Sequence, residues 1–432
     1  KSFSFKNTFN ATSFNLIGFD HSISGGVDFS RTNLQRLRTT PYLEYKSPLR
    51  DSNIDCGGNN FDCIEQSYLL SLDELATQLG GSIDLTKEEH YLAYSNNLVN
   101  RGQFFQLRRV YPIENIDVSL NSIGMYIQDS FTAKNLSGRI GFRVDNNDSL
   151  NNWNIAPRLH LGYDLFSNQE SMFVFGASRY YANDMMSYKV KEAQRSYLTQ
   201  YRPIFEGVLQ PWITSSAAPQ YRHLYDGLNT PYSDELTVGF KQQLLGGVLS
   251  LNYVHRQSKD KVVRGDSFVE NGLTHIYQTN DGESSHSRYS LSYSTVVFSS
   301  SLMFNVNKTE NKSNAESSEE SIENIPDDEL IYLEEENYTL ISRDGLTILQ
   351  DNFSRPLTAN LSLSTDLTEK IQSTLNVSYT GKYKSYEYTG QERSVERGDI
   401  VCPGCNVTAI EYPIFRKVER RPRTMVSLRL AY

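Results

Sequence analysis

Apolar and polar residues alternate along most of this chain, and the alternation constrains its fold more than any other feature of the sequence. In the clearest run, Leu357, Ala359, Leu361 and Leu363 alternate with Thr, Asn and Ser. A period of two places successive side chains on opposite faces of a β-strand, whereas an α-helix requires a period near 3.6. The pattern recurs near 3–9, 23–29, 140–144, 159–163, 236–240, 249–253, 289–293, 302–306 and 375–379. The sequence therefore predicts an all-β protein whose strands have one apolar and one polar face.

The connections between the predicted strands alternate in length. Short links lie at 132–136, 166–169, 245–247, 297–299 and 367–370, and long polar segments lie at about 37–113, 184–232, 259–283, 310–353 and 389–412. Short turns at one end and long loops at the other are typical of an outer-membrane barrel, with turns in the periplasm and loops outside. A β-sandwich has no reason to separate its connections in this way. We predict a transmembrane antiparallel β-barrel of the bacterial cell outer membrane, in contact with lipid and lipopolysaccharide.

The composition is compatible with this fold. Hydrophobic residues make up 38% of the 432 residues, and no stretch approaches the roughly 18 apolar residues that a transmembrane helix requires. Barrel strands that are half lipid-facing and half lumen-facing give an unremarkable average hydropathy. The net charge of −9 argues against nucleic-acid binding, which favours a basic face.

The last residues alternate up to a terminal aromatic: Val426, Leu428, Leu430 and Tyr432. This pattern resembles the C-terminal signal that the barrel-assembly machinery reads, and the alternative is an ordinary final strand.

If the last strand ends in the periplasm, counting backwards gives thirteen strands, and the first of them, near 2–12, also runs inward. Bacterial barrels close with an even number of strands. We therefore expect an odd number of strands upstream of Lys1.

Several predicted strands resemble those of TonB-dependent outer-membrane receptors in sequence, order and spacing. The matching segments are 18–29, 124–130, 139–144, 155–165, 173–181, 232–239 and 254–256. The resemblance implies a 22-stranded barrel, of which residues 1–432 are the C-terminal part. It also implies a plug domain and a TonB-contacting segment, neither of which lies within these residues. The implied function is energised uptake of a scarce nutrient, most often a ferric siderophore or other iron chelate.

The predicted loop 184–232 interleaves aromatic residues with arginines. Aromatic rings offer stacking area and arginine binds anionic oxygens, which suits a bulky chelate. The predicted ligand-binding residues are Tyr180, Tyr181, Tyr201, Arg202, Trp212, Arg222, His223 and Tyr225. The alternative is that the loop packs its aromatic residues against one another.

Six polar or aromatic residues of the barrel wall are expected to face inward and to solvate the lumen or contact the plug. They are Tyr126, Gln128, Arg139, Arg143, Arg158 and His160.

Two other functions stay open. Haem-importing members of the family carry an axial histidine between two loop motifs, and His223 occupies a comparable position, although both flanking motifs differ here. A haem or protein-bound iron receptor is therefore an alternative. A passive porin or an adhesion barrel is another. The seven histidines show no recurring spacing to a nucleophile, so we do not expect an enzyme.

The four cysteines form two close pairs in predicted extracellular loops, Cys56 with Cys63 and Cys402 with Cys405. Local disulfides are expected in an oxidising compartment. Zinc or redox chemistry is the alternative for a Cys-x-x-Cys spacing. A redox motif lacks its βαβ context here, and a four-cysteine zinc site would require the two loops to meet. We expect two disulfides, with no metal and no cofactor.

The segment 310–353 contains 13 acidic residues against two basic ones. Such a run could attract calcium or a cationic partner. The alternative, which we favour, is a solvated and partly disordered loop.

Overall fold

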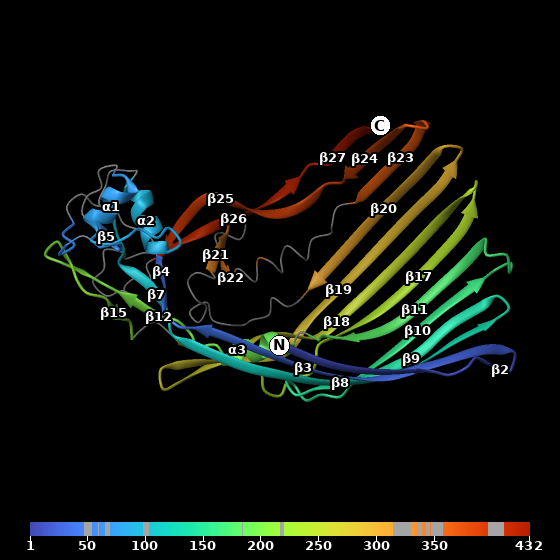
Figure 1. Ribbon diagram of the computed structural model, residues 1–432, viewed down its shortest axis with the longest axis horizontal. Helices are drawn as coiled ribbons and strands as arrows, with labels where there is room; N and C mark the ends of the chain where they lie inside the picture. The colour runs from blue at the N-terminus through green and yellow to red at the C-terminus, as the bar shows by residue number, and fades with distance from the viewer. Residues whose placement is uncertain are drawn as a thin grey trace.

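The computed structural model describes residues 1–46, 54–58, 60–64, 70–97, 103–183, 185–216, 220–313, 330–334, 339–342, 346, 357–395 and 410–432. One curved antiparallel sheet dominates it (Figure 1). In order across the sheet, its strands are β1 (Ser2–Asn10), β3 (Phe19–Arg38), β8 (Glu114–Ala133), β9 (Leu136–Asn147), β10 (Asn154–Asp164), β11 (Ser171–Tyr181), β17 (Tyr232–Leu244), β18 (Gly247–Glu270), β19 (Leu273–Val297), β20 (Ser300–Ser313), β23 (Thr358–Thr368), β24 (Ile371–Thr380) and β27 (Arg423–Ala431). Two further strands, β2 (Phe14–Leu16) and β16 (Gln220–Leu224), pair with β3 and β19. Among the described residues, the path across the sheet thus has thirteen strands, which confirms the prediction.

The register of the sheet produces two faces. Leu251 of β18 pairs with Phe240 of β17 and with Leu291 of β19, and Leu291 pairs with Val306 of β20. Because side chains alternate along each strand, these apolar residues form continuous rows on one face. Many of them are exposed on the isolated chain; Leu251, for example, is 41% exposed. We call this the apolar face and the opposite one the polar face.

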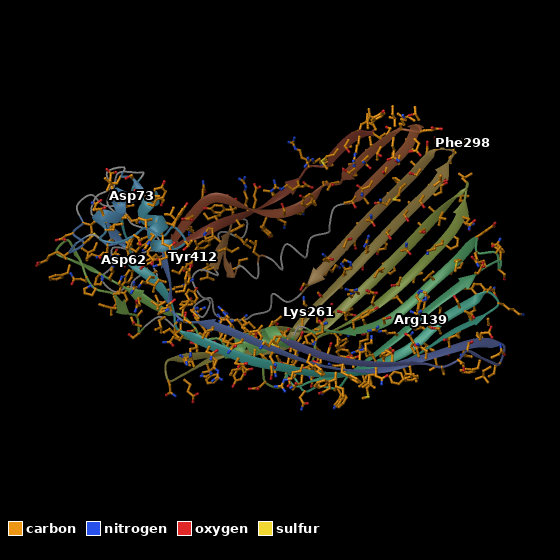
Figure 2. All side chains as sticks on the ribbon, viewed as in Figure 1. Asp62, Asp73, Arg139, Lys261, Phe298 and Tyr412 are labelled. Carbon is orange, nitrogen blue, oxygen red and sulfur yellow. A yellow bond between two sulfur atoms is a disulfide. The ribbon has the colours of Figure 1, made fainter. Side chains whose placement is uncertain are left out.

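Short turns gather at one end of the sheet and long connections at the other (Figure 1). The turn between β17 and β18 consists of Leu245 and Gly246, both with positive φ (52° and 72°). Two such residues make the tight hairpin turn whose twist matches that of the flanking strands. Figure 2 places Phe298 at the turn end, and Asp62 and Tyr412 at the loop end.

Two connections at the loop end carry small elements of their own. The first contains β4 (Tyr42–Lys46), β5 (Cys63–Ile64), α1 (Leu72–Gln78), α2 (Glu88–Asn97), β6 (Gln103–Phe104) and β7 (Leu107–Tyr111). The second contains α3 (Met185–Ala193), β12 (Leu198–Tyr201), β13 (Ile204–Phe205), β14 (Val208–Leu209) and β15 (Ile213–Thr214). A four-stranded sheet in the order β15-β12-β7-β4 joins the two connections. We call this assembly the loop cluster. No helix among the described residues is long and apolar enough to cross a membrane.

The loop cluster contains a disulfide between Cys56 and Cys63, as the cysteine spacing predicts. Cys63 is buried with Ile54, Phe104 and Leu209, so the bond lies in a small apolar core shared by both connections. The second predicted pair, Cys402 and Cys405, lies outside the described residues.

The segment 259–283, expected as a long loop, is instead a β-hairpin. Strands β18 and β19 continue through it to a turn at Asn271 and Gly272. The pairing shifts register between Ser258 and Lys261 and twice more before the tip. Each bulge inserts residues that break the period of two, which hid these strands from the sequence pattern.

The interpretation of 310–353 as a solvated loop is wrong for residues 330–333, which are buried. Strands β21 (Leu330–Leu333) and β22 (Thr339–Ser342) form a hairpin, and β21 adds in parallel to β26 (Ile410–Arg420), which pairs with β25 (Tyr383–Val395). Leu330, Ile331 and Leu333 are at most 1% exposed. A short apolar run within an acidic segment therefore docks as a buried strand.

Candidate ligand-binding site

The polar face is hollowed where β3, β8, β9, β10, β11 and β17 lie side by side. The hollow has a volume of about 910 Å³. Its polar and aromatic lining includes Asp20, Tyr126, Gln128, Arg139, Arg143, Arg158, His160, Tyr180 and Glu235. The six wall residues proposed from the sequence all lie here, and Tyr180 joins them. Alternation along adjacent strands brings them together, because residues two apart on one strand share a face with their cross-strand partners.

Two arginines of the hollow present unneutralised charge. Arg158 of β10 pairs across the sheet with Ser178, and its guanidinium carbon lies 5.2 Å from the ring centre of Tyr180. Arg139 of β9 donates from Nε to the Ser130 hydroxyl at 3.3 Å. No described carboxylate lies within ion-pair distance of either guanidinium. The hollow therefore offers two cations, one of them beside an aromatic ring, an arrangement that attracts anionic oxygens.

Arg143 differs from these two arginines because carboxylates surround it. Its Nη2 donates to Asp28 at 2.9 Å and its Nε donates to Asp145 at 2.8 Å. Gly124 lies opposite, and a side chain there would collide with the guanidinium. Arg143 thus ties β3 to β9 and contributes no free positive charge. Asp145 is two residues from Arg143 on the same strand, whereas Asp28 has no sequence signature because it is 115 residues away.

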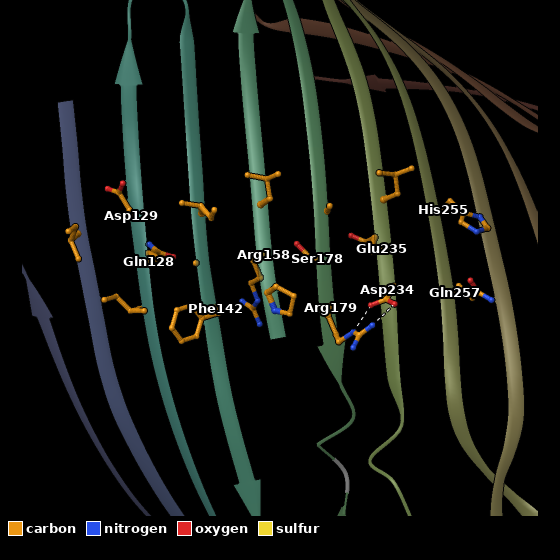
Figure 3. A pocket seen from close by; sticks show the side chains of 18 residues that line it. Gln128, Asp129, Phe142, Arg158, Ser178, Arg179, Asp234, Glu235, His255 and Gln257 are labelled. Atoms are coloured by element: carbon orange, nitrogen blue, oxygen red, sulfur yellow. Dashed lines mark hydrogen bonds and ion pairs between the residues drawn. The ribbon is translucent and has the colours of Figure 1, made fainter. Parts of the chain in front are cut away.

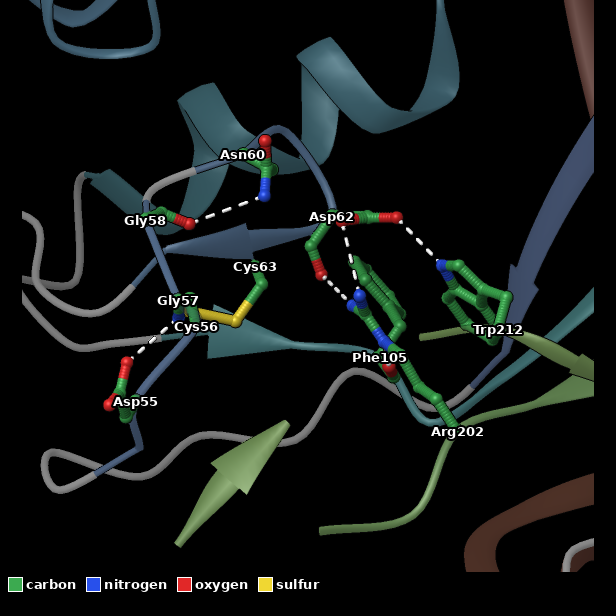
Figure 4. The surroundings of a disulfide bond; sticks show 10 residues. All are labelled: Asp55, Cys56, Gly57, Gly58, Asn60, Asp62, Cys63, Phe105, Arg202 and Trp212. Carbon is green, nitrogen blue, oxygen red and sulfur yellow. Dashed lines mark hydrogen bonds and ion pairs between the residues drawn. A yellow bond between two sulfur atoms is a disulfide. The ribbon is translucent and has the colours of Figure 1, made fainter. Parts of the chain in front are cut away.

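Arg202, predicted to bind ligand, lies inside the loop cluster and is 6% exposed. Its Nε donates to the Phe105 carbonyl and its Nη2 to the Asp62 carbonyl, both at 2.6 Å (Figure 4). The Trp212 indole donates to the Asp62 carboxylate at 3.0 Å, and the Arg202 guanidinium stacks 4.4 Å from the Trp212 ring centre. Through these contacts Arg202 and Trp212 hold the two long connections together. Asp62 contacts both of them, and no feature of the sequence indicates this role for it.

The other predicted residues are scattered rather than gathered in one site. Tyr180 and Tyr181 are consecutive in β11 and face opposite ways, so Tyr181 contacts the Tyr232 ring on the apolar face, with 5.7 Å between ring centres. Tyr225 is buried and stacks on Tyr188 of α3 at 4.9 Å between ring centres. Of the remaining predicted ligand-binding residues, Tyr201 is half-buried in β12 and Arg222 is exposed in β16.

His223 lies in β16, which runs parallel to β19. Its Nδ1 lies 3.3 Å from the side-chain nitrogen of Gln278. Burial, with the positive charges of Lys191 and Arg264, lowers the pKa of His223 to about 4. The imidazole is therefore neutral at pH 7. Within the described part of the chain, no group of three or more His, Cys, Asp or Glu side chains is placed to hold a metal ion.

We expect the pairing of β16 with β19 to weaken as the pH falls from about 6.5 to about 4. Unfolded His223 takes up a proton near pH 6.5, but folded His223 does so only near pH 4, so acid favours the open state across this window. The effect is about 2 kcal/mol once partial solvent exposure is allowed for. Hydrogen-exchange protection factors of the 220–224 amides measure it. In His223→Gln the pH dependence should flatten, and equal dependence in both proteins would contradict this account.

The family comparison decides the class of protein. The family model described as "TonB dependent receptor-like, beta-barrel" matches residues 2–431. The chain belongs to this family. The resemblance inferred from the strand motifs is thereby confirmed, and the family locates the chain in the bacterial outer membrane. Its members are receptors and transporters. The apolar face is accordingly the lipid-facing one, and the polar face lines the lumen.

Individual relatives agree with this assignment. The uncharacterized protein YddB of Escherichia coli is 28% identical over 266 residues, which covers 59% of this chain and 30% of YddB. The crystal structure of the outer-membrane transporter YddB superposes with a TM-score of 0.61 at 17% identity, over 99% of this chain and 47% of that one.

Two receptor structures share the fold at lower similarity. The siderophore receptor PirA of Acinetobacter baumannii gives a TM-score of 0.51 at 14% identity, over 100% of this chain and 48% of PirA. The ferric enterobactin receptor PfeA of Pseudomonas aeruginosa, in a mutant form with enterobactin, gives 0.52 at 14% identity, over 99% and 46%. The chain therefore spans about half the length of these structures or less.

Proposed function

We propose that this chain supplies the C-terminal wall and loops of an outer-membrane transporter for TonB-energised uptake of an iron chelate, with ferric siderophores as the substrate class. The observation that carries the proposal is the hollow on the lumen face, which Arg139, Arg158, Tyr126 and Tyr180 line together. Arg158 lies beside the Tyr180 ring, and no described carboxylate is within ion-pair distance of either arginine. Siderophore chelates are bulky, commonly anionic and often aromatic, so cations beside aromatic rings suit them. The siderophore receptor PirA and the ferric enterobactin receptor PfeA share the fold.

The mechanism assigns different roles to the two ends of the sheet. The loop cluster and the extended β18–β19 hairpin form the extracellular side, where exposed Arg222 and half-buried Tyr201 are available for first contact. Arg202, Trp212 and Tyr225 then act as framework that shapes these loops. Tyr180 and the arginines of the hollow receive the chelate within the lumen. TonB acts through a plug domain, which membership of the family implies.

A strain that lacks the receptor gene, complemented with the full-length receptor, tests this function. We expect complementation to restore growth on at least one ferric siderophore as sole iron source. Arg139→Ala with Arg158→Ala should lower the initial uptake rate of that siderophore at least tenfold, because each lost contact with an anion is worth about 1.5–3 kcal/mol. Arg288→Ala, a lumen-face arginine outside the hollow, is the matched control.

The outcomes separate the alternatives. Unchanged growth on every iron source would exclude iron chelates. Growth on haem alone, abolished by His223→Gln, would favour the haem alternative. Conductance of the purified receptor that needs neither TonB nor the proton-motive force would favour a passive porin.

A further inference from the structure

An ionisable pair lies on the lipid-facing side of the sheet. His21 precedes Ile23 by two residues on β3, and Asp129 follows Ile127 by two residues on β8, so both share the apolar face. His21 Nδ1 lies 2.7 Å from Asp129 Oδ2. Ionisable side chains that face hydrocarbon are costly and rare, and they generally mark a function. The pair lies on the face opposite the lumen and apart from the loop cluster, so ligand uptake does not explain it.

The pair lies near the turn end of the sheet, which faces the periplasm. Asp129 is four residues from the end of β8, and His21 is two residues from the start of β3. Aromatic rings surround the pair: the Phe14 ring stacks on His21 with 5.4 Å between centres, and Phe19 and Phe131 contact each other at 5.8 Å. Aromatic girdles mark the membrane–water interfaces of barrels. The pair therefore lies at the level of the phospholipid headgroups of the periplasmic leaflet.

A groove on the same face begins at Asp129 of this pair. It has a volume of about 980 Å³ and crosses seven strands, from β3 to β18. Its apolar lining consists of Ile23, Ile127, Ile140, Phe142, Pro157, Leu159, Ala177 and Leu236. Toward β11, β17 and β18 the lining becomes polar, with the ion-paired Arg179 and Asp234 and with His255. Asp129 lies at one end and Gln257 at the other (Figure 3). Six spacings of about 4.8 Å give a length of about 29 Å, enough for an extended acyl chain.

The unused hydrogen-bonding capacity of the pair identifies the headgroup. Asp129 Oδ1 is buried and has no hydrogen-bond partner among the described residues, whereas the carboxylate side chain as a whole is 24% exposed. Among the described residues, His21 forms one hydrogen bond, at Nδ1, which leaves Nε2 available. A carboxylate forms its strongest hydrogen bonds with cationic donors, and an imidazole N–H forms its strongest with anionic acceptors. An ammonium group a few atoms from a phosphate meets both requirements.

We propose that the barrel binds one phosphatidylethanolamine molecule of the periplasmic leaflet at this site. The lipid ammonium donates to the Asp129 carboxylate, and His21, as the doubly protonated imidazolium, donates from Nδ1 to Asp129 and from Nε2 to the phosphate. One acyl chain lies in the groove over Ile127, Phe142 and Leu159. The aromatic rings of Phe14 and Phe131 pack against the upper part of the chains. This proposal does not depend on which ligand the receptor imports.

Native mass spectrometry of the full-length receptor in detergent tests the site. The delipidated receptor is titrated with phosphatidylethanolamine, phosphatidylcholine and phosphatidylglycerol of identical acyl chains. The dissociation constant of the first bound lipid molecule should be at least tenfold lower for phosphatidylethanolamine than for the other two lipids. Phosphatidylcholine has no N–H donor, and phosphatidylglycerol has no cation. Asp129→Asn should abolish this preference, and His21→Gln should weaken it. Asp117→Asn, the same change at an exposed position of the same strand outside the groove, should keep it.

Several results would overturn the proposal. Equal affinity for the three lipids would show an ordinary apolar surface, and a preference that Asp129→Asn retains would place the headgroup elsewhere. Occupation of the groove by a co-purifying membrane protein instead of lipid would also contradict it. The ranking of the three lipids on the wild-type receptor needs no variant, so the test stands even if a substitution impairs folding. Heat-dependent mobility on gels checks that each variant barrel is folded.

Discussion

Replacing Arg202 with alanine is expected to unfold the loop cluster and leave the barrel inserted. The substitution removes the bonds to Phe105 and Asp62 and leaves the half-buried Asp62 carboxylate without its main cation. Breaking a buried ion pair by removing one partner costs about 3–5 kcal/mol. Hydrogen exchange should show a loss of protection across 103–111 and 198–214, whereas the strands of the sheet should keep theirs.

Two variants control this experiment. Arg222→Ala removes an exposed arginine from the same connection and should change protection little. Arg202→Lys retains the charge but cannot reproduce the fork of bonds to two carbonyls, so it should fall between alanine and wild type. Full protection of the cluster in Arg202→Ala would show that the disulfide and the small apolar cores hold it without this arginine.

The second large effect is expected from Ile331→Asp in β21. Ile331 is 0% exposed and packs with Leu333 and Leu346. A carboxylate in this position has no partner, so the strand would leave its site rather than bury the charge. We expect the loss to exceed about 3 kcal/mol and the amides of 412–415 on β26 to lose protection against exchange.

The acidic character of the surrounding segment is not the cause of this expected loss. Glu334→Gln, an exposed change at the end of β21, should therefore leave the amides of β26 protected. Ile331→Val should have a small effect, since it removes one methylene group. Retention of full protection in Ile331→Asp would mean that β21 contributes little to the edge of β26.

The wall of the barrel can be predicted from the sequence because its two rules are local. Side chains alternate along a strand, and short turns fix the register between neighbours. Positions such as Arg139, Arg158 and His160 can therefore be assigned to one face from the alternation alone. The β18–β19 hairpin cannot, because its bulges change which face each later residue occupies. Tyr181 lies at the end of a strand, where alternation separates it from Tyr180 although both are close to the predicted loop.

The loop residues are harder to predict because their partners are remote. Arg202 contacts Phe105 from 97 residues away, and an arginine that binds a ligand has the same composition signal as one that joins two loops. Composition likewise hides β21, where four apolar residues lie within an acidic segment. Burial is a tertiary property, so a short buried run can reverse what its flanking charges suggest.

The position of β21 also determines how a barrel containing this sheet can close. β26 pairs with β25 on one side and with β21 on the other, whereas β27 pairs only with β24 within the described residues. Any strand that closes against this edge therefore has the nine residues Arg423–Ala431 available. Nine residues is about the length of a strand that crosses a bilayer. The closing strand would then pair with β27 only within the membrane. Beyond the membrane, the hairpin of β21 and β22 would cover the edge of β26.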